Sequence, residues 1–219
     1  MDDLLNRLAR VQVSSLSDAD KTLPVCDPAV QSLLPDVTLV GVAFTVRADG
    51  DLLGMIDAIG RAEPGSVLVA ATDGRPLAAS GELFATEARR RGLAGIVVDG
   101  YCRDLRGIRR VGLPVFARGT TPAAGPALGP VVVQQPVTFG GIRVRPGDIV
   151  VGDDDGLLIA PPERIAAAID RAEEIERVEA EVAEGMRSGR SLYDLTNARE
   201  HLRAVAAGEE STFRFQPGG

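Results

Sequence analysis

Residues 95–104 read Gly95-Ile96-Val97-Val98-Asp99-Gly100-Tyr101-Cys102-Arg103-Asp104 and join a short apolar run to a charged pair. The run is rich in β-branched residues and is bounded by glycines, which predicts a buried strand. Arg103 and Asp104 stand side by side just after this strand. Ligands of α/β proteins tend to bind at the carboxyl ends of strands, so we expect a functional site at this edge of a sheet.

The segments on both sides of this strand alternate between strand and helix patterns. Strands are predicted over residues 38–46, 66–70 and 113–117, and helices over residues 51–61, 82–91 and 104–111. Gly92 is placed to end the second of these helices. This alternation is typical of a parallel α/β unit. A helical pattern also covers residues 2–22, with residues 15–20 as a separate short helix.

The second half of the chain changes to short strands joined by tight turns. Gly140-Gly141 predicts a two-residue hairpin between strands at 137–139 and 142–144. Asp153-Asp154-Asp155-Gly156 predicts a turn between two further strands, because a calcium loop would need ligands at alternate positions and a distal Glu. Helices are predicted over residues 163–184 and 191–207. Since no linker-like stretch separates the halves, we predict one mixed α/β domain over residues 1–219.

The composition is that of a folded, acidic chain. Its 219 residues are 45% hydrophobic, which is enough for one sizeable core, and its formal net charge is −7. An acidic balance disfavours general nucleic-acid binding, which requires cations to offset phosphate charge. The acidic N-terminus predicts no signal peptide, and no run approaches the roughly 20 apolar residues of a membrane span. We therefore expect a cytoplasmic protein that does not bind membranes.

The histidine and cysteine content excludes several kinds of catalytic site. The one histidine, His201, stands in a charged helical pattern, which argues against a histidine-rich zinc centre and against a Ser-His-Asp triad. Cys26 and Cys102 have no clustered spacing, so we expect two small packed side chains. The alternative for Cys102 is a thiol whose pKa is lowered by the neighbouring Arg103.

Three charged residues are the main candidates for a binding site. Arg103 offers a planar fork suited to a carboxylate or an enolate, and Asp104 offers a hard oxygen ligand for Mg²⁺ or Mn²⁺. Glu82 follows Gly81 at a helix start, where the free N–H groups of residues 82–84 attract anions. An Arg-Asp pair alone is often only a local ion pair. The combination at one sheet edge favours a site for a metal ion and a small keto acid.

Six blocks of the sequence, in order, resemble the RraA-like family. Three surround the charged residues: Gly81-Glu82-Leu83-Phe84-Ala85-Thr86, residues 95–104, and Leu113-Pro114-Val115-Phe116-Ala117-Arg118-Gly119. The others are residues 39–46, 64–69 and 144–156. The resemblance covers about residues 10–185. The family includes the 4-hydroxy-4-methyl-2-oxoglutarate aldolases and the regulator of ribonuclease E activity A.

The resemblance implies a fold and an assembly. The fold is a mixed three-layer β/β/α sandwich of the swivelling-domain kind, with its core at about 10–185 and a C-terminal helical extension at about 186–219. The assembly is a homotrimer or homohexamer with sites near subunit boundaries. An acid from a neighbour's C-terminal helix is implied as well, for which Glu176, Glu179 and Glu181 are equal candidates.

The resemblance also implies a class II pyruvate aldolase, a lyase that depends on Mg²⁺ or Mn²⁺. It would cleave 4-hydroxy-2-oxo acids, such as 4-hydroxy-4-methyl-2-oxoglutarate, to pyruvate, with oxaloacetate decarboxylation as a side activity through the same enolate. Asp104 matches the direct metal ligand, Arg103 a substrate-binding residue, and Glu82 an acid in the outer shell of the metal. The substrate-binding loop matches the backbone of Gly81, Glu82, Leu83 and Phe84. The best-known aldolases have Asp in place of Glu82, and one extra methylene could move a bridging water.

A second interpretation is a non-catalytic regulator that binds a ribonuclease-type partner. Such regulators tend to have Gly in place of Glu82, and acidic residues soon after the Arg-Asp pair, where this chain has Leu105-Arg106-Gly107. Both differences favour an enzyme. A methyltransferase is disfavoured because no glycine-rich nucleotide loop follows a first strand. Arg118 is a further candidate for lining the site, against a plain surface arginine.

Overall fold

The computed structural model describes residues 1–218 and divides the chain into two compact units. The first unit is Met1–Ile169, and the second begins at Asp170. The sequence placed the helical extension at about residue 186, where Gly185–Gly189 interrupts the pattern. The division between the two compact units lies inside one helix, α6 (Pro162–Arg187). No helix within residues 1–218 combines the length and hydropathy that a membrane-spanning segment requires.

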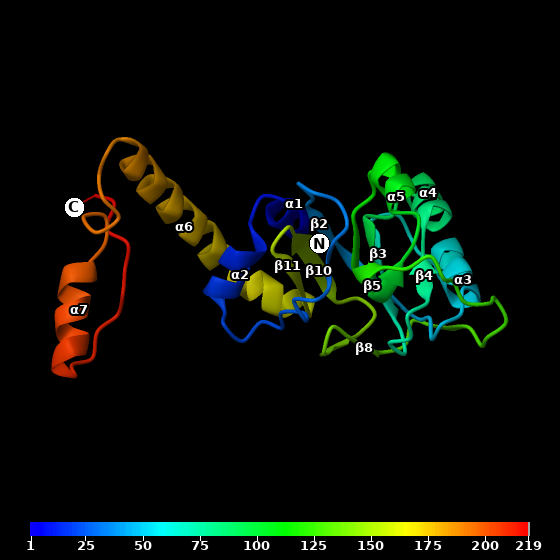
Figure 1. The fold of residues 1–219 in the computed structure, drawn as a ribbon. Coiled ribbons are helices and arrows are strands. Elements are labelled where there is room, and N and C mark those ends of the chain that lie inside the picture. The colour runs from blue at the N-terminus through cyan, green and yellow to red at the C-terminus, as the bar shows by residue number, and fades with distance from the viewer. Residues whose placement is uncertain (219) are drawn as a thin grey trace. The chain divides into compact units, whose positions relative to one another are not determined.

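The first unit is built on a nine-stranded mixed sheet (Figure 1). Its strands follow in the order β1 (Gln31–Ser32), β6 (Val115–Thr120), β5 (Gly95–Cys102), β3 (Ser66–Ala71), β2 (Leu39–Arg47), β10 (Ile149–Asp153) and β11 (Gly156–Ala160). The two remaining strands, β4 (Ala78–Ser80) and β7 (Val132–Val133), pair with β5 and β2. The central strands are parallel, whereas β10 pairs antiparallel with β2. The end strands β1 and β11 also lie close to each other, so the sheet is nearly closed.

Strand alternation gives the sheet two buried faces and therefore three layers. In β3, Leu68 and Ala70 face one core, and Val67 and Val69 face the other. The first core lies under helices α3 (Leu53–Arg61), α4 (Glu82–Arg90) and α5 (Leu105–Val111). The second lies under the hairpin of β8 (Val137–Phe139) and β9 (Ile142–Val144), from which Phe139 is fully buried. This arrangement confirms the predicted β/β/α sandwich.

Most elements of the first unit lie where the sequence predicted them. Gly140 and Gly141 both have positive φ in the β8–β9 hairpin, and Gly92 has a φ of 76° just after α4. The turn at 153–156 joins β10 to β11. The pattern over 2–22 resolves into α1 (Asp2–Leu8) and α2 (Val13–Ala19). The short strands β1 and β4 were not predicted.

The second unit contains the end of α6, helix α7 (Ala198–Ala207) and the chain that follows. The helix predicted over 191–207 was too long, because α7 begins only after Asn197. The Ser191 hydroxyl bonds the side chain and the backbone N–H of Asp194, and such local bonds compete with helix formation. Asn197 then bonds the Thr212 carbonyl and the Arg214 N–H, which ties the C-terminal segment to the start of α7.

An ion-pair cluster on the hairpin side holds the N-terminal segment to the sheet. Arg118 of β6 bonds Asp99 of β5 at 2.5 Å and Asp27 at 2.8 Å. The second oxygen of Asp99 accepts the N–H of Gly140 at 2.9 Å, so the cluster also reaches the β8–β9 turn. The Ala29 N–H and then Arg118 lower the pKa of Asp27. Arg118 therefore has a structural role, and the expectation that it lines the site is wrong.

We expect Arg118→Ala to lower the free energy of unfolding by about 2 kcal/mol, because it leaves the largely buried Asp99 carboxylate without its cation. Urea unfolding at pH 7 measures the change. Arg47→Ala is the matched control, since Arg47 pairs with Asp49 on the surface and such pairs contribute only about 0–1 kcal/mol. Equal effects of the two substitutions would contradict a special role for the Arg118 cluster.

Candidate functional site

Arg103 and Asp104 line a cavity of about 220 Å³ beyond the end of β5. The remaining wall comes from α3, β4 and the start of α4, through Leu52, Ile56, Ala78, Ser80, Gly81, Leu83 and Phe84. A second cavity of about 300 Å³, lined by Thr120 and Thr121 among others, also borders Arg103 and Asp104. The fold thus brings together the cation, the carboxylate and the helix start that the sequence singled out.

The short strand β4 positions the start of α4 against β5. The Arg103 N–H donates to the Ser80 carbonyl at 2.9 Å, and β4 pairs parallel with the last residues of β5. On the other side, the Ala78 N–H donates to the carbonyl of Ala123 at 2.7 Å. Because these bonds involve only backbone groups, the sequence pattern gave no direct signal for them.

Gly81 leaves the space that the Asp104 carboxylate occupies. A Cβ atom at position 81 would lie 2.7 Å from Asp104 Oδ2 and 3.0 Å from Arg103 Cγ. The φ of Gly81 is −167°, an extended value open to any residue, so space and not backbone conformation requires glycine here. Asp104 itself has a φ of 58° at the N-cap of α5, a conformation that Asp and Asn tolerate better than most residues.

The charges of Arg103 and Asp104 are only loosely paired. Arg103 Nε lies 3.5 Å from Asp104 Oδ2, and the two side chains are 42% and 44% exposed. Within residues 1–218 the Asp104 carboxylate has no closer polar partner, which leaves its oxygens open toward the cavity. An exposed pair of this kind adds little stability, so both groups can turn to a ligand at small cost.

Glu82 points away from this cavity. Its Oε1 accepts a hydrogen bond from Arg110 Nη2 at 3.0 Å. Its carboxyl carbon lies only 2.3 Å from the position that a Cβ of residue 107 would take, so glycine is needed there. Glu82 is therefore packed on the backbone of α5 and is not among the residues that line the Arg103–Asp104 cavity. The orientation depends on Arg110 and Gly107, neither of which the sequence had linked to Glu82.

The donor set around the cavity fits a metal ion that is held mainly by small molecules. No cluster of three or more Asp, Glu, His or Cys side chains able to hold a metal occurs in the described part of the chain. Mg²⁺ is commonly bound through one or two carboxylates, with waters and substrate oxygens completing its shell. Asp104, with its open oxygens, can supply one such carboxylate. Glu176, Glu179 and Glu181 all belong to the second unit and stay equal alternatives for an acid from a neighbouring subunit.

The remaining candidate groups are not placed for catalysis at this site. Burial raises the pKa of the Cys102 thiol to about 12, so the expectation of a lowered pKa beside Arg103 is wrong. Burial and then Asp99 raise the pKa of Cys26 to about 12 as well. Both cysteines are packed apolar side chains, as expected. His201 lies on α7, where its Nδ1 meets Ser211 Oγ at 2.9 Å.

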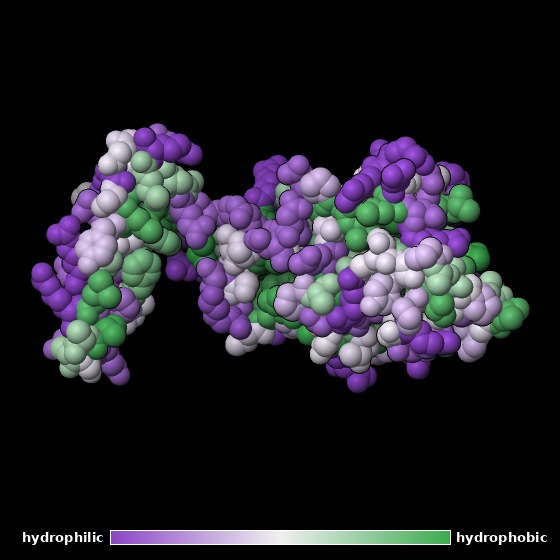
Figure 2. Space-filling view, viewed as in Figure 1, coloured by the Kyte–Doolittle hydropathy of each residue, from purple (hydrophilic) through white to green (hydrophobic). Residues whose placement is uncertain are grey.

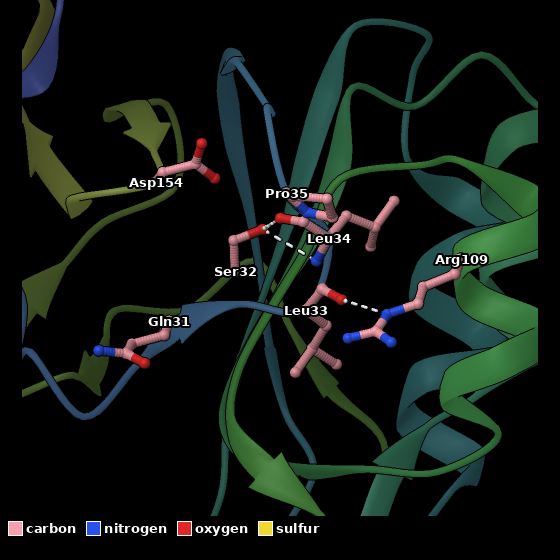
Figure 3. A pocket seen from close by; sticks show the side chains of 7 residues that line it. All are labelled: Gln31, Ser32, Leu33, Leu34, Pro35, Arg109 and Asp154. Carbon is pink, nitrogen blue, oxygen red and sulfur yellow. Dashed lines mark hydrogen bonds between the residues drawn. The ribbon is translucent and has the colours of Figure 1, made fainter.

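A larger hollow of about 510 Å³ lies between the 31–35 segment, Arg109 and Asp154 (Figure 3). Three of its four polar side chains are already bound to nearby backbone groups. Arg109 donates to the carbonyl of Leu33, and the Ser32 hydroxyl donates to the carbonyl of Leu34 (Figure 3). Asp154 Oδ2 accepts the Asp36 N–H at 3.0 Å. This hollow is therefore a weaker candidate than the smaller cavity at Arg103.

Asp51 fastens the loop that runs behind the Arg103–Asp104 cavity. Its carboxylate accepts the N–H groups of Leu53, Leu128 and Gly129 at 2.7–2.8 Å. The Leu128 N–H contributes most to lowering the pKa of Asp51, followed by that of Leu53. The same loop carries Ala123, the partner of β4, so Asp51 indirectly supports one wall of the cavity.

The fold and the site indicate a β/β/α protein in which an Arg-Asp pair and a helix start face one cavity at the edge of the sheet. Comparison with known proteins gives its family. Residues 13–159 match the family model described as RraA-like, Aldolase/RraA. The chain therefore belongs to the RraA-like family. A Halalkalibacterium halodurans protein named "Putative 4-hydroxy-4-methyl-2-oxoglutarate aldolase" is 35% identical over 161 residues, which are 73% of this chain and 77% of that protein.

Two solved structures extend the likeness to most of the chain. An uncharacterised protein from Pseudomonas syringae pv. tomato superposes with a TM-score of 0.78 and 28% identity, covering 87% of this chain and 95% of that one. Streptomyces coelicolor RraAS2, described as an unusual member of the RNase ES inhibitor RraA protein family, superposes with a TM-score of 0.71 and 28% identity, covering 86% and 96%. The family therefore contains both kinds of relative that the sequence had indicated.

We expect Asp51→Asn to lower the free energy of unfolding at pH 7 and to weaken its dependence on acid. The folded-state pKa of Asp51 lies below the unfolded value of about 3.9, so its contribution is present above pH ~4 and is lost as pH falls through the folded pKa. Urea unfolding at pH 7 and pH 3 measures both effects.

Asp57→Asn, on the exposed side of α3, is the control for the loss of one charge. The gap between wild type and Asp51→Asn should shrink at pH 3. A gap of the same size at both pH values would mean that the Asp51 charge does not hold the loop.

Proposed function

We propose that this protein is a divalent-metal-dependent pyruvate aldolase that cleaves 4-hydroxy-2-oxo acids such as 4-hydroxy-4-methyl-2-oxoglutarate. Oxaloacetate decarboxylation is proposed as a side activity, because it passes through the same enolate. One observation carries the proposal: Arg103, Asp104 and the first residues of α4 face a single cavity of about 220 Å³. A cavity of this size suits a small acid, and its aldolase-named relative supports the reaction class.

Arg103 and Asp104 have separate roles in this proposal. The Asp104 carboxylate would hold the cation, Mg²⁺ or Mn²⁺, which when bound supplies Lewis-acid polarisation of the keto oxygen. The Arg103 guanidinium binds the substrate through its planar fork. The N–H groups at the start of α4, from Glu82, Leu83 and Phe84, attract the substrate carboxylate. Gly81 keeps the approach to this backbone open.

The reaction requires stabilisation of charge that develops on the pyruvoyl part of the substrate. A water molecule acts as base and takes the proton of the 4-hydroxyl. The C4–O group becomes the carbonyl of the second product as the C3–C4 bond breaks, and the bonding electrons pass into the enolate of pyruvate. Arg103 stabilises the enolate oxygen as its charge grows, which is where a fixed donor contributes most. Protonation at C3 then gives pyruvate. Glu82, held by Arg110, would act only through water in the outer shell of the cation.

An oligomer is part of the proposal, as a homotrimer or homohexamer. Ile56 and Leu83, which border the cavity, are 50% and 76% exposed. Figure 2 shows apolar patches on this part of the surface, over α3 and α4. Apolar side chains around a polar site are typical of a surface that another subunit covers.

The alternative function is regulation of a ribonuclease-type partner without catalysis. The likeness to RraAS2, described as a member of the RNase ES inhibitor family, favours it. Such a role needs an exposed surface, and it does not need an open carboxylate beside an arginine. The aldolase is therefore preferred, and an assay of turnover separates the two functions.

We expect pyruvate release from 4-hydroxy-2-oxo acids that requires Mg²⁺ or Mn²⁺ and falls by about 100-fold or more in Asp104→Asn. Asn keeps the shape and tolerates the positive φ at position 104 while it removes the charge. Asp36→Asn is the matched control, because Asp36 also has a positive φ, of 55°. A coupled lactate dehydrogenase assay measures the rate. No metal-dependent turnover of several such acids by folded wild-type protein would rule out the aldolase.

We expect Arg103→Lys to lower kcat by about 10²–10³-fold, since lysine keeps the charge but cannot form two parallel bonds to the enolate or carboxylate. Arg106→Lys, on the exposed surface of α5, should leave the rate nearly unchanged. Steady-state kinetics of both variants give the comparison. A near-normal rate for Arg103→Lys would assign Arg103 a structural role.

A further inference from the structure

We propose that the Ser80 hydroxyl is a substrate-binding donor, which gives a hydrogen bond to an oxygen of the 2-oxo acid held by Arg103. The proposal rests on the function proposed above and adds a residue that neither the sequence motifs nor the relatives' names single out. Ser80 is the last residue of β4 and stands directly before Gly81. It is one of three residues with a polar or charged side chain that line the cavity, the others being Arg103 and Asp104.

The pairing of β4 with β5 places the Ser80 side chain on the cavity side. Ala79 packs into the core beneath the helices. Ala78 and Ser80, one residue to either side of it, both line the cavity. The register shifts between Ala78 and Ser80, and Ser80 pairs with Cys102 of β5, whose side chain faces the helix layer. Paired residues of neighbouring strands project to the same face of a sheet, so the Ser80 side chain lies on the helix side, where α3 and α4 form part of the cavity wall. Its backbone is fixed there, because the Ser80 carbonyl accepts the Arg103 N–H.

The Ser80 hydroxyl is buried and has no hydrogen-bond partner within residues 1–218. The residue is 2% exposed, and its Oγ is one of two buried side-chain atoms without a partner in this part of the chain. An unpaired buried hydroxyl lowers the stability of the folded state, so such groups are rare and call for an explanation. A group that the folded chain leaves unpaired is satisfied when a ligand or a water reaches it.

The chemistry of the cavity selects an anionic oxygen as that ligand. The N–H groups at the start of α4 and the Arg103 guanidinium are all donors that favour anions. Apart from Asp104, the rest of the wall is apolar. A hydroxyl at the base of this donor set adds one more donor for a carboxylate or enolate oxygen. Hydrogen bonds to charged groups are stronger than those between neutral groups.

Substitution of Ser80 by alanine tests this role with opposite effects on stability and on binding. If the hydroxyl serves only the ligand, Ser80→Ala removes an unpaired group, and the ligand-free protein should melt at the same temperature or up to about 4 °C higher. The dissociation constants for oxalate and pyruvate in Mg²⁺ should rise by about tenfold or more. Calorimetric titration and thermal unfolding measure both quantities, and neither depends on turnover.

Thr45→Val is the matched control, because it removes a buried hydroxyl that does have a partner. Thr45 Oγ1 donates to the carbonyl of Gln135 at 2.7 Å, on β2 and away from the cavity. This variant should melt at a lower temperature, by about 2–4 °C, and should bind oxalate as the wild type does. The two substitutions thus predict opposite patterns in the same pair of measurements.

Each outcome decides the role of Ser80. Weaker binding with unchanged or higher melting temperature supports a donor to the substrate. Unchanged oxalate and pyruvate binding in Ser80→Ala overturns the proposal, even if the wild type is an active aldolase. A melting temperature lowered as in Thr45→Val also overturns it, since the hydroxyl would then be structural. Failure of the wild type itself to bind either acid would instead reject the proposed function, and with it this role.

Discussion

The site depends on one backbone contact, the hydrogen bond from the Arg103 N–H to the Ser80 carbonyl. This bond ends the pairing of β4 with β5 and sets the start of α4 beside Arg103 and Asp104. Because Gly81 has no side chain, the Asp104 carboxylate can stand where a Cβ would otherwise be. The position of the charged pair is therefore inherited from a buried parallel sheet. Sites built on rigid strands and helix starts hold their geometry better than sites on free loops.

The layers of the fold could be predicted from the sequence because the strands that build them are long and strongly patterned. Arg103 and Asp104 could be located at the edge of the sheet for the same reason, since they follow the strand that begins at Gly95. The position of Ser80 at the cavity could not be predicted, because β4 has only three residues, too few for a period-two pattern to stand out. Ile56 was missed because a helical pattern predicts which face is buried, but not what lies beside the exposed face. The direction of Glu82 depends on Arg110 and on the absence of a side chain at Gly107, and no local rule links these positions.

The end of β5 serves stability on one face and the site on the other. Asp99 turns toward the hairpin layer, where Arg118 and the Gly140 N–H bind its carboxylate. Cys102 turns into the helix-side core, and its burial raises the pKa of the thiol, which makes the thiolate inaccessible despite the adjacent arginine. Only after this last buried residue do Arg103 and Asp104 reach the cavity. The order of residues along β5 thus explains why Arg103 and Asp104 line the cavity, while the neighbouring Cys102 is buried in the core.

The state of the polar groups in the cavity bears on the choice between enzyme and regulator. A surface selected only for docking has no need of the buried Ser80 hydroxyl, which has no partner within residues 1–218. It also has no need of glycine at position 81, where a Cβ would lie 2.7 Å from the Asp104 carboxylate. Both features lower the stability of the ligand-free protein or restrict its sequence, and such features usually persist where a ligand uses them. The apolar residues around the cavity, Ile56 and Leu83, are compatible with either function, because a second subunit or a foreign partner could cover them. The polar side chains that line the cavity, Ser80, Arg103 and Asp104, are therefore the more informative part of the surface. They favour a small anionic ligand over a protein partner.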